Sequence, residues 1–307
     1  MTNPAPAPFG HEPVLLNEAM AWLSPTADGT YCDATVGLGG HAEAILERSS
    51  PNGRLIGIDR DPEALERAGA RLARFGDRVS LVHARFGSMH TVLQGVAAVP
   101  VDGCLVDLGV SSMQLDRPLR GFSFRHGGPL DMRMDPSQGE TAAELLHRAP
   151  ASELEAILRD LGEERFARKI ANAIVACRGR EDLSTTSGLA ELVARVAPSR
   201  ERNKDPATRT FQALRIAIND ELGELERFLE DLPRCLRPGG RVVVISFHSL
   251  EDRIVKRGLR ALSSRELAGG PVLRLLTKHV VVAGDEERAR NPRSRSAKLR
   301  AAERLPS

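Results

Sequence analysis

The sequence predicts an α/β protein built on an open, largely parallel sheet with helices on both faces. Two observations lead to this prediction. Short apolar segments alternate with amphipathic helical segments, which is the pattern of parallel strands joined by helices. In addition, the first apolar segment, at 30–36, leads into a glycine-rich turn and then into a helix, as in one half of a doubly wound nucleotide-binding sheet.

The glycine-rich turn is the first candidate binding feature. Gly37 and Gly39 allow a tight turn, and the helix at 42–48 offers unpaired N–H groups at its start. A second strand at 54–58 leads to Asp59, about 20 residues past the glycines, where a carboxylate can bind ribose hydroxyls. The glycine spacing alone is a weak motif. It leaves three interpretations open: a plain turn, a nicotinamide site and an S-adenosylmethionine site.

Residues with useful chemistry follow the next strands as well. A third strand at 79–84 precedes Phe86, whose ring is equally suited to lie against an adenine or to pack in the core. The fourth strand ends in Asp107. Ligands of open α/β sheets bind outside the carboxyl ends of the strands. The repeated placement of Asp33, Asp59, Phe86 and Asp107 near strand ends therefore predicts a site at that edge.

Composition narrows the class of protein. The 307 residues are 41% hydrophobic and 27% charged, with a formal net charge of +2, so no global positive field indicates nucleic acid. No apolar run reaches membrane-spanning length. The four cysteines are far apart, which argues against a zinc site or a disulfide framework. We expect a soluble cytoplasmic protein with no membrane partner and no metal site.

The pattern changes after the fourth strand. The segment 108–138 is rich in Gly, Ser, Arg, Asp and Met, and its interleaved arginines and aromatic residues favour an ordered binding loop. Capping-box patterns at Thr141 and Ser152 predict the start of two helices. Further helices are expected at 163–177 and 186–196.

These segments predict the domain organisation. Residues 1–10 contain alternating prolines and form a disordered lead-in. A helical insertion at 113–204 interrupts an α/β domain made of 11–112 and 205–307. The second part of that domain opens with a helix from Asp205 towards Leu232, because Asp205-Pro206 is a good helix start.

The C-terminal part completes the predicted sheet. A turn at 236–240 precedes a buried fifth strand, and His248 follows the end of that strand. Two last strands are expected at 272–276 and 279–282. A basic tail follows, and its clustered charges fit contacts with phosphates, although such runs are often only solvated. Its members are Arg288, Arg290, Arg293, Arg295, Lys298 and Arg300.

Several longer motifs carry a family resemblance. Asp33-x-x-x-Gly37-x-Gly39 and the Leu-x-Pro-Gly-Gly turn are similar to class I methyltransferases. More specifically, the chain after Gly10 resembles the 16S rRNA cytosine-N4 methyltransferase family (RsmH, also called MraW). The motifs that resemble this family, in the same order, lie at 11–16, 35–41, 107–116, 120–124, 129–135, 246–253 and 291–300.

The resemblance implies a fold, an activity and partners. The fold is a class I, Rossmann-like S-adenosylmethionine-dependent methyltransferase sheet with an inserted all-helical domain for substrate recognition. The activity is methyl transfer from S-adenosylmethionine to the exocyclic N4 amine of a decoding-centre cytidine. The implied partner is 16S rRNA within the small ribosomal subunit. Whether the chain forms a homodimer is left open.

The resemblance also implies site residues. The glycine turn would hold the donor, Asp59 would take the ribose hydroxyls, and Phe86 would neighbour the adenine. The residues that would bind the donor are Gly39, Gly40, His41, Asp59, Phe86, Asp107 and Gln114. The unranked candidates for accepting the proton of the amine are Asp107, Ser111 and Asp131.

The sequence departs from the broader amino-methyltransferase pattern after the fourth strand. Those enzymes carry two prolines and an aromatic residue there, whereas Leu108 follows Asp107 in this sequence. The geometry with which that motif binds the acceptor amine is therefore not assigned to this chain. Three other functions stay open on the residues alone: a nicotinamide-dependent oxidoreductase, a non-catalytic RNA-binding factor, and a methyltransferase acting on DNA or protein.

Overall fold

The computed structural model describes the chain except for residues 1–11, 126, 180–181, 198–204, 266–269 and 307. The disordered lead-in expected at 1–10 therefore lies outside the described residues. The chain divides into two compact units. Unit 1 comprises Met1–Gly109 and Leu222–Ser307, and unit 2 comprises Val110–Glu221.

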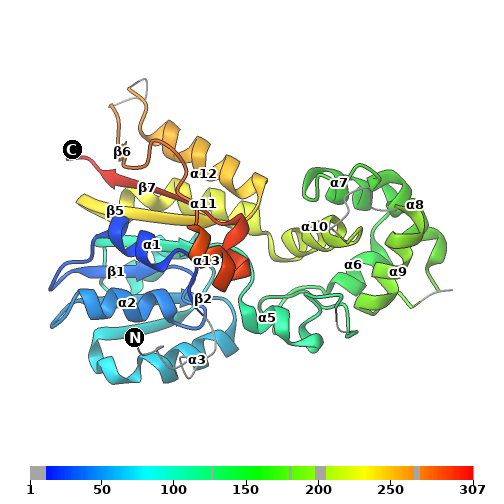
Figure 1. Cartoon of the computed structure of the whole chain (residues 1–307), viewed down its shortest axis with the longest axis horizontal. Helices are drawn as coiled ribbons and strands as arrows, with labels where there is room; N and C mark the ends of the chain where they lie inside the picture. The colour runs from blue at the N-terminus through cyan, green and yellow to red at the C-terminus, as the bar shows by residue number, and fades with distance from the viewer. Residues whose placement is uncertain (1–11, 126, 180–181, 198–204, 266–269, 307) are drawn as a thin grey trace. The chain divides into compact units, whose positions relative to one another are not determined.

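Unit 1 is built on a seven-stranded sheet of order β3-β2-β1-β4-β5-β7-β6 (Figure 1). Strands β1 to β5 run parallel, and β7 is antiparallel to both β5 and β6. The strand order reverses between β1 and β4, which is the doubly wound arrangement. The predicted α/β class is confirmed. The strands are β1 (Thr30–Asp33), β2 (Arg54–Asp59), β3 (Val79–His83), β4 (Val101–Asp107), β5 (Leu236–Ser246), β6 (Leu273–Leu275) and β7 (Lys298–Arg304).

Both faces of this sheet are buried. Val242 and Val244 of β5 belong to one apolar core, whereas Val243 and Ile245 belong to the other. A parallel strand that is covered on both sides is expected to be such a β-branched run. The helices of the two cores are α1 (Leu16–Leu23), α2 (Gly40–Arg48) and α3 (Pro62–Leu72) on one face, and α4 (Met89–Gly95), α11 (Glu221–Cys235) and α12 (Ser249–Leu262) on the other. Shorter elements are η1 (Ala73–Arg78), η2 (Phe86–Ser88), α13 (Asp285–Arg290) and η4 (Pro292–Ser296).

The C-terminal part of the sheet differs from the prediction. Residues 279–282 contribute only an isolated bridge between Val281 and Leu299. The last strand of the structure is β7, which the prediction did not contain. Its residues were interpreted instead as part of the basic tail. Leu299 and Ala301 of β7 are fully buried, and the charged residues Lys298 and Arg300 on either side of Leu299 conceal this alternation. The prediction was wrong here because charge clustering was given more weight than period-two burial.

Two cations of the predicted basic tail form ion pairs within unit 1. Arg300 Nε lies 2.7 Å from Asp252 Oδ1, and Lys298 Nζ lies 3.4 Å from Asp252 Oδ2. Asp252 belongs to α12, so these ion pairs join that helix to β7. The part of the tail that forms β7 therefore stabilises the sheet.

Unit 2 is helical. Its elements are α5 (Ser112–Asp116), η3 (Pro118–Arg120), α6 (Ala142–Arg148), α7 (Ala151–Asp160), α8 (Ala167–Cys177), α9 (Thr186–Val196) and α10 (Thr208–Asn219). The helix predicted at 186–196 and the capping box at Thr141 are confirmed. The capping box at Ser152 is wrong, because α7 begins at Ala151 with Pro150 as its N-cap. The helix expected from 163 begins at Ala167.

Unit 2 extends past the expected end of the insertion at 204. We expected one helix from Asp205 to Leu232, but a left-handed residue, Asp220, separates α10 from α11. The buried side chain of Asn219 accepts the N–H of Met134 at 2.8 Å and donates to the Met132 carbonyl at 2.7 Å. These bonds tie the end of α10 to the 132–134 segment, so α10 belongs with unit 2.

The described residues of the long connection at 108–138 are held in place by side-chain contacts. Arg120 donates to the carbonyls of Arg133 and Met134 at 3.1 and 2.9 Å. Phe122 is buried, and the Phe124 ring packs edge-on against Phe211 with centroids 4.9 Å apart. Both rings are part of the core of unit 2 rather than open platforms for stacking bases. None of the helices in the described ranges is both long enough and apolar enough to span a bilayer.

Candidate functional site

The carboxyl ends of four neighbouring parallel strands meet at one edge of unit 1. In the register of the sheet, Asp33 pairs with Gly57 and Leu105, and Asp107 pairs with Ile245. Asp59 pairs with His83, three residues before Phe86. The predicted residues Asp59, Phe86 and Asp107 therefore all follow strand ends on the same edge, together with the glycine turn.

The glycine turn is fixed from both sides. Gly37 N–H donates to Asp59 Oδ2 at 2.8 Å, and the Asp107 N–H donates to Thr35 Oγ1 at 2.7 Å. Gly37 and Gly39 have φ values of 51° and 78°, which only glycine adopts without strain. Gly39 is the N-cap of α2 and has no side chain to cap the helix. The first N–H groups of α2 are thus available to a ligand.

Gly40 and His41 pack against the segment that leads into α1. A Cβ on Gly40 would lie 2.4 Å from Pro13 Cγ, so no larger residue fits there. His41 is 6% exposed, and its Nε2 lies 3.0 Å from the Val14 carbonyl. Its Nδ1 lies 3.7 Å from Asp107 Oδ2. The His41 ring therefore bridges the start of the chain and the end of β4.

Three carboxylates, Asp33, Asp59 and Asp107, form what we name the acid cluster. Burial raises the pKa of Asp33 to about 7, opposed by a hydrogen bond from the Thr35 N–H and reinforced by the charge of Asp59. Burial likewise raises the pKa of Asp59 to about 6, against hydrogen bonds from the N–H groups of Asp61 and Gly37. Burial, followed by the charges of Asp33 and Glu251, raises the pKa of Asp107 well above its usual value.

The acid cluster fits a cationic ligand. Asp33 Oδ2 and Asp107 Oδ1 are buried and have no hydrogen-bond partner among the described residues. Leaving such oxygens unpaired is costly, and the three nearby negative charges repel one another. S-adenosylmethionine offers an ammonium group, a sulfonium charge and ribose hydroxyls, which are the complementary groups.

Phe86 lies beside the acid cluster at the end of β3. Its ring is half-buried and lies 6.1 Å from the Phe228 ring, in an edge-on arrangement. The next residue, Gly87, donates its N–H to Glu224 Oε2 at 2.9 Å. Core packing and contact with an adenine are compatible here, because the ring packs against the core of unit 1 and is still partly exposed.

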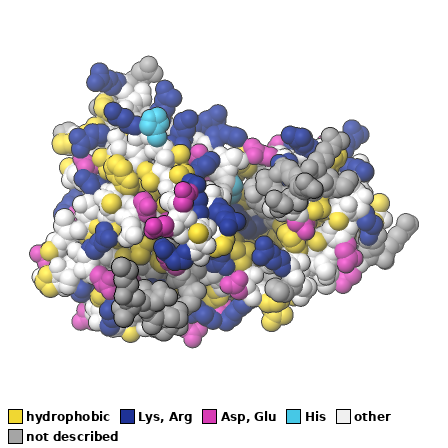
Figure 2. Space-filling model, viewed as in Figure 1, with side chains coloured by type: hydrophobic (Ala, Val, Ile, Leu, Met, Phe, Trp, Pro, Cys, Tyr) yellow, Lys and Arg dark blue, Asp and Glu magenta, His cyan; other side chains and the backbone are white. Residues whose placement is uncertain are grey.

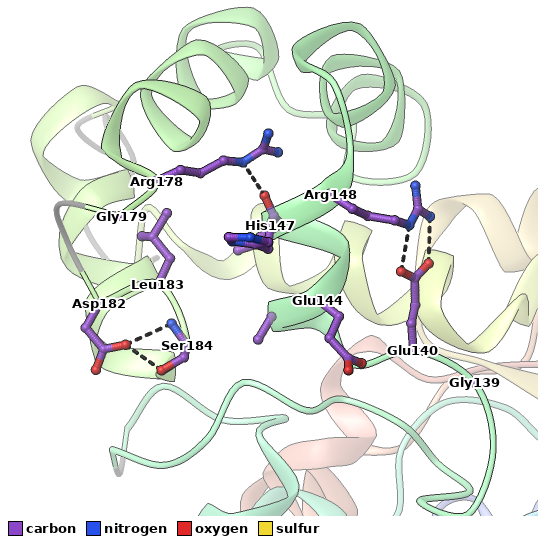
Figure 3. A pocket seen from close by; sticks show the side chains of 12 residues that line it. Gly139, Glu140, Glu144, His147, Arg148, Arg178, Gly179, Asp182, Leu183 and Ser184 are labelled. Atoms are coloured by element: carbon purple, nitrogen blue, oxygen red, sulfur yellow. Dashed lines mark hydrogen bonds and ion pairs between the residues drawn. The ribbon is translucent and has the colours of Figure 1, made fainter.

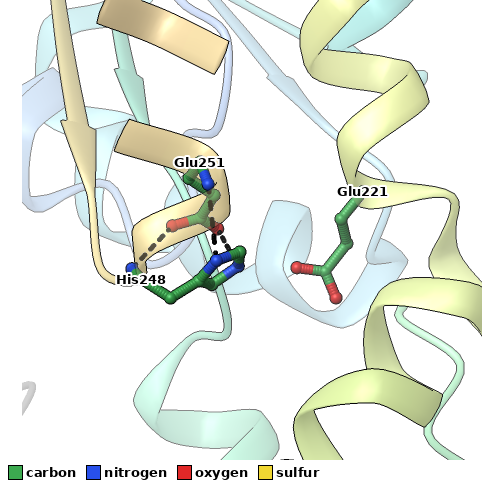
Figure 4. A group of neighbouring side chains, drawn as sticks. All are labelled: Glu221, His248 and Glu251. Atoms are coloured by element: carbon green, nitrogen blue, oxygen red, sulfur yellow. Dashed lines mark hydrogen bonds and ion pairs between the residues drawn. The ribbon is translucent and has the colours of Figure 1, made fainter. Parts of the chain in front are cut away.

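Two functional candidates past the end of β5 were seen only as part of a motif. The buried Glu251 accepts the N–H groups of Phe247 and His248 at 2.8 and 3.2 Å. Its Oε1 lies 3.0 Å from His248 Nε2 (Figure 4). The motif at 246–253 includes these residues. No local pattern in the sequence predicted that Glu251 would be buried, or that its charge would raise the pKa of Asp107.

The three remaining predicted residues belong to unit 2. Ser111 caps α5, with its Oγ accepting the Gln114 N–H at 3.3 Å while Gln114 Oε1 accepts the Ser111 N–H at 2.9 Å. Asp131 binds Arg133 through both oxygens at 2.7 and 2.8 Å. Burial raises the pKa of Asp131, but the hydrogen bonds and charge of Arg133 outweigh it and hold that pKa below its usual value.

A cavity of about 820 Å³ lies within unit 2. Figure 3 shows that its arginines are already engaged, because Arg148 pairs with Glu140 and Arg178 donates to the Leu146 carbonyl. Glu144 and Asp182 also line it. No predicted site residue lines this cavity, and its charges are of both signs.

Comparison with known proteins places the chain in a family. The MraW methylase family matches residues 8–305. The chain is 53% identical to ribosomal RNA small subunit methyltransferase H of Sorangium cellulosum, over 98% of this chain and 94% of that protein. It is 52% identical to the protein of that name from Geobacter sulfurreducens (97% and 99% covered) and 51% identical to that of Nitratidesulfovibrio vulgaris (98% and 97%). The chain belongs to the MraW methylase family.

Proposed function

We propose that this protein transfers a methyl group from S-adenosylmethionine to the exocyclic N4 amine of a decoding-centre cytidine in 16S rRNA, within the small ribosomal subunit. The observation that carries the proposal is the acid cluster at the carboxyl edge of a doubly wound sheet, in a chain of the methylase family. The relatives' names support small-subunit rRNA as the substrate, and the family resemblance supports the cytidine N4 position. We place the protein in the cytoplasm, because its proposed substrate, the small ribosomal subunit, is found there.

S-adenosylmethionine is the cofactor, and when bound it supplies a methyl group already activated on a sulfonium. The Gly39 N–H already donates to the Val36 carbonyl at 2.8 Å, so Gly39 would contribute by shaping the turn. The N–H groups of Gly40 and His41 would bind the donor at the start of α2. Asp33 and Asp107 each have a buried oxygen without a partner. Asp33 Oδ2 would accept a hydrogen bond from the ammonium group, and the Asp107 carboxylate would balance the sulfonium charge.

Asp59 is suited to the ribose. Its Oδ2 accepts the Gly37 N–H at 2.8 Å and its Oδ1 accepts the Asp61 N–H at 2.9 Å. Each carboxylate oxygen has a second lone pair, so both can also accept a ribose hydroxyl. The same carboxylate therefore fixes the glycine turn and would orient the nucleoside.

The acceptor amine needs a group that takes its proton. The cytosine N4 lone pair is delocalised into the ring, and a hydrogen bond to an acceptor would localise it. Among the three candidates, Asp107 is the best supported, because its Oδ1 is unpaired. Ser111 Oγ caps a helix and Asp131 is bound by Arg133. The raised pKa makes the Asp107 carboxylate the strongest base of the three.

His41 would assist Asp107. When His41 Nε2 donates to the Val14 carbonyl at 3.0 Å, the unprotonated Nδ1 faces Asp107 Oδ2 at 3.7 Å. After Asp107 takes the proton of the amine, an approach of the His41 ring to hydrogen-bond distance would let Nδ1 share that proton. Sharing the proton would lower the cost of holding it in a buried site.

Unit 2 is proposed to contribute to recognition of rRNA. It begins at Val110, three residues after Asp107, at which the strand leading to the site ends. A target base must leave its stack to enter a pocket, and contacts to the neighbouring nucleotides hold it there. This assignment is tested by whether the substrate range changes when exposed residues of unit 2 are altered.

Transfer of labelled methyl from S-adenosylmethionine to isolated small subunits tests the proposal. Mass mapping of nucleosides in the rRNA should place one new methyl on a cytidine N4, and Asp107→Asn should abolish it while leaving binding of subunits intact. A methyl found on another base, on DNA or on a ribosomal protein would refute the assignment. Binding without any transfer would favour the non-catalytic RNA-binding factor.

A further inference from the structure

Helix α12 presents four cations on one face. Arg253, Lys256, Arg257 and Arg260 follow the spacing i, i+3, i+4, i+7, which aligns side chains along one side of a helix. All four are exposed, and Figure 2 shows Lys and Arg side chains gathered over this helix. We name these residues the cationic face of α12.

The orientation of this face is fixed by the opposite side of the helix. Val255 and Leu259 are 1% exposed and pack in the core. The two acids of the helix, Glu251 and Asp252, are also turned away from the cationic face, because Glu251 binds backbone N–H groups and Asp252 binds Arg300. The solvent-facing side of α12 therefore carries positive charge without interspersed negative charge.

Three other exposed arginines of unit 1 are neutralised by carboxylates. Arg67 pairs with Glu63 at 3.4 Å, Arg74 with Glu43 at 3.0 Å, and Arg234 with Asp231 at 3.7 Å. Within the described ranges, no carboxylate forms an ion pair with Lys256, Arg257 or Arg260. Leaving three like charges close together costs repulsion, which a polyanion bound there would relieve.

We propose that the cationic face of α12 binds the sugar-phosphate backbone of the rRNA strand next to the target nucleotide. This inference rests on the proposed function, because it names a contact of the same substrate. Helix α12 begins at Ser249, three residues past the end of β5 at the site edge. The face is about 10 Å long, so it spans consecutive phosphates of one strand.

The contact would supply affinity and register rather than sequence choice. Arginine and lysine bound to phosphates act on any sequence and release counterions. The cationic face should therefore matter for binding the subunit and not for the methyl-transfer step. A charge effect of this kind has a measurable salt dependence, whereas a role in packing would not.

The test uses the full-length protein and isolated small subunits that lack the modification. Lys256→Gln/Arg257→Gln/Arg260→Gln removes three charges from the face. Arg67→Gln/Arg74→Gln/Arg234→Gln is the matched control, because it lowers the formal net charge from +2 by the same three. Affinity is measured at several salt concentrations, together with KM, kcat and the Kd for S-adenosylmethionine.

For the α12 variant, we expect the slope of log K against log salt to become shallower by about 2, since each phosphate contact contributes about 0.7 to 0.9. KM for subunits should rise about tenfold or more, with kcat and the donor Kd unchanged. The control should keep the wild-type slope. An α12 variant that matches the control in slope and KM overturns the inference.

The experiment also distinguishes failure of the proposed function from failure of the RNA contact, and binding of RNA from binding of a lipid or an acidic protein. If the wild type binds subunits with a steep slope but methylates no cytidine, the proposed function fails while the binding contact still stands. Vesicles of phosphatidylglycerol and a polyglutamate peptide are tested in parallel. If the α12 variant loses binding to either of these but not to the subunit, the partner is a lipid or an acidic protein, and the RNA contact is refuted.

Discussion

The buried carboxylate of Glu224 accepts the backbone N–H of Gly87, with 2.9 Å between Glu224 Oε2 and the nitrogen. Glu224 is 2% exposed, and a Cβ on Gly87 would lie 2.4 Å from the same oxygen. Glu224 Oε1 also binds Arg85 and Arg227, at 3.3 and 2.9 Å. Helix α11 thus holds the backbone just after Phe86 and the side chain of the residue just before it, so Glu224 is a positioning residue for the proposed adenine contact.

Glu224→Ala is expected to weaken S-adenosylmethionine binding about tenfold or more. The reason is that the N–H of Gly87, the residue after Phe86, loses a charge-assisted hydrogen bond worth about 1.5–3 kcal/mol. Glu224→Gln should recover most of the affinity, because an amide oxygen still accepts the Gly87 N–H. Calorimetric titration of the donor measures both. Glu226→Ala, at an exposed position of the same helix, is the control, and equal affinities for the two alanine variants would contradict the positioning role.

Asp59→Asn should reduce donor affinity about 10- to 100-fold while lowering Tm by only a few degrees. The amide keeps one acceptor oxygen but places an NH₂ group where the carboxylate accepts hydrogen bonds, so a ribose hydroxyl and one backbone N–H lose their partner. Calorimetry with S-adenosylmethionine and thermal melting without it separate binding from folding. Unchanged donor affinity would refute the ribose assignment.

Asp33→Asn should change how stability depends on pH in the absence of donor. The folded carboxyl keeps its proton up to about pH 7, whereas the unfolded one loses it near 3.8. Raising the pH through this window therefore favours the unfolded chain, by at most about 4 kcal/mol. The stability of the variant relative to wild type should improve from about pH 4 to pH 7 and level off above pH 7. Urea titrations at four pH values measure this, and a constant difference would contradict the raised pKa.

The single-turnover rate of methyl transfer should rise with pH in wild type. Only the ionised Asp107 accepts a proton, and its pKa lies well above the usual value because of burial and the charges of Asp33 and Glu251. Raising the pH therefore increases the fraction of competent enzyme. The donor's positive charge should shift the midpoint downwards relative to the free protein. Quenched-flow rates from pH 6 to pH 9 test this, and a flat profile would exclude Asp107 as the proton acceptor.

The sequence alone determined the fold and most of the edge where the site lies. β1, β2 and β4, the turn at Gly37 and Gly39, and the placement of Asp59 and Asp107 were all predictable. These features depend on local signals: apolar runs, glycines where φ must be positive, and strand ends that parallel topology places together. The helix at 186–196 was predictable for the same reason.

Tertiary structure decided what depends on partners far apart in the chain. Arg300 and Lys298 looked like a basic tail until Asp252 and the buried side of β7 were in place. The hydrogen bonds of Asn219 to residues 132–134 place α10 in unit 2 rather than in the α/β domain. Glu224 is recognised as a positioning residue only from its hydrogen bond with the Gly87 N–H. Burial and hydrogen-bond partnership arise only when distant segments pack, so no local pattern in the sequence encodes them.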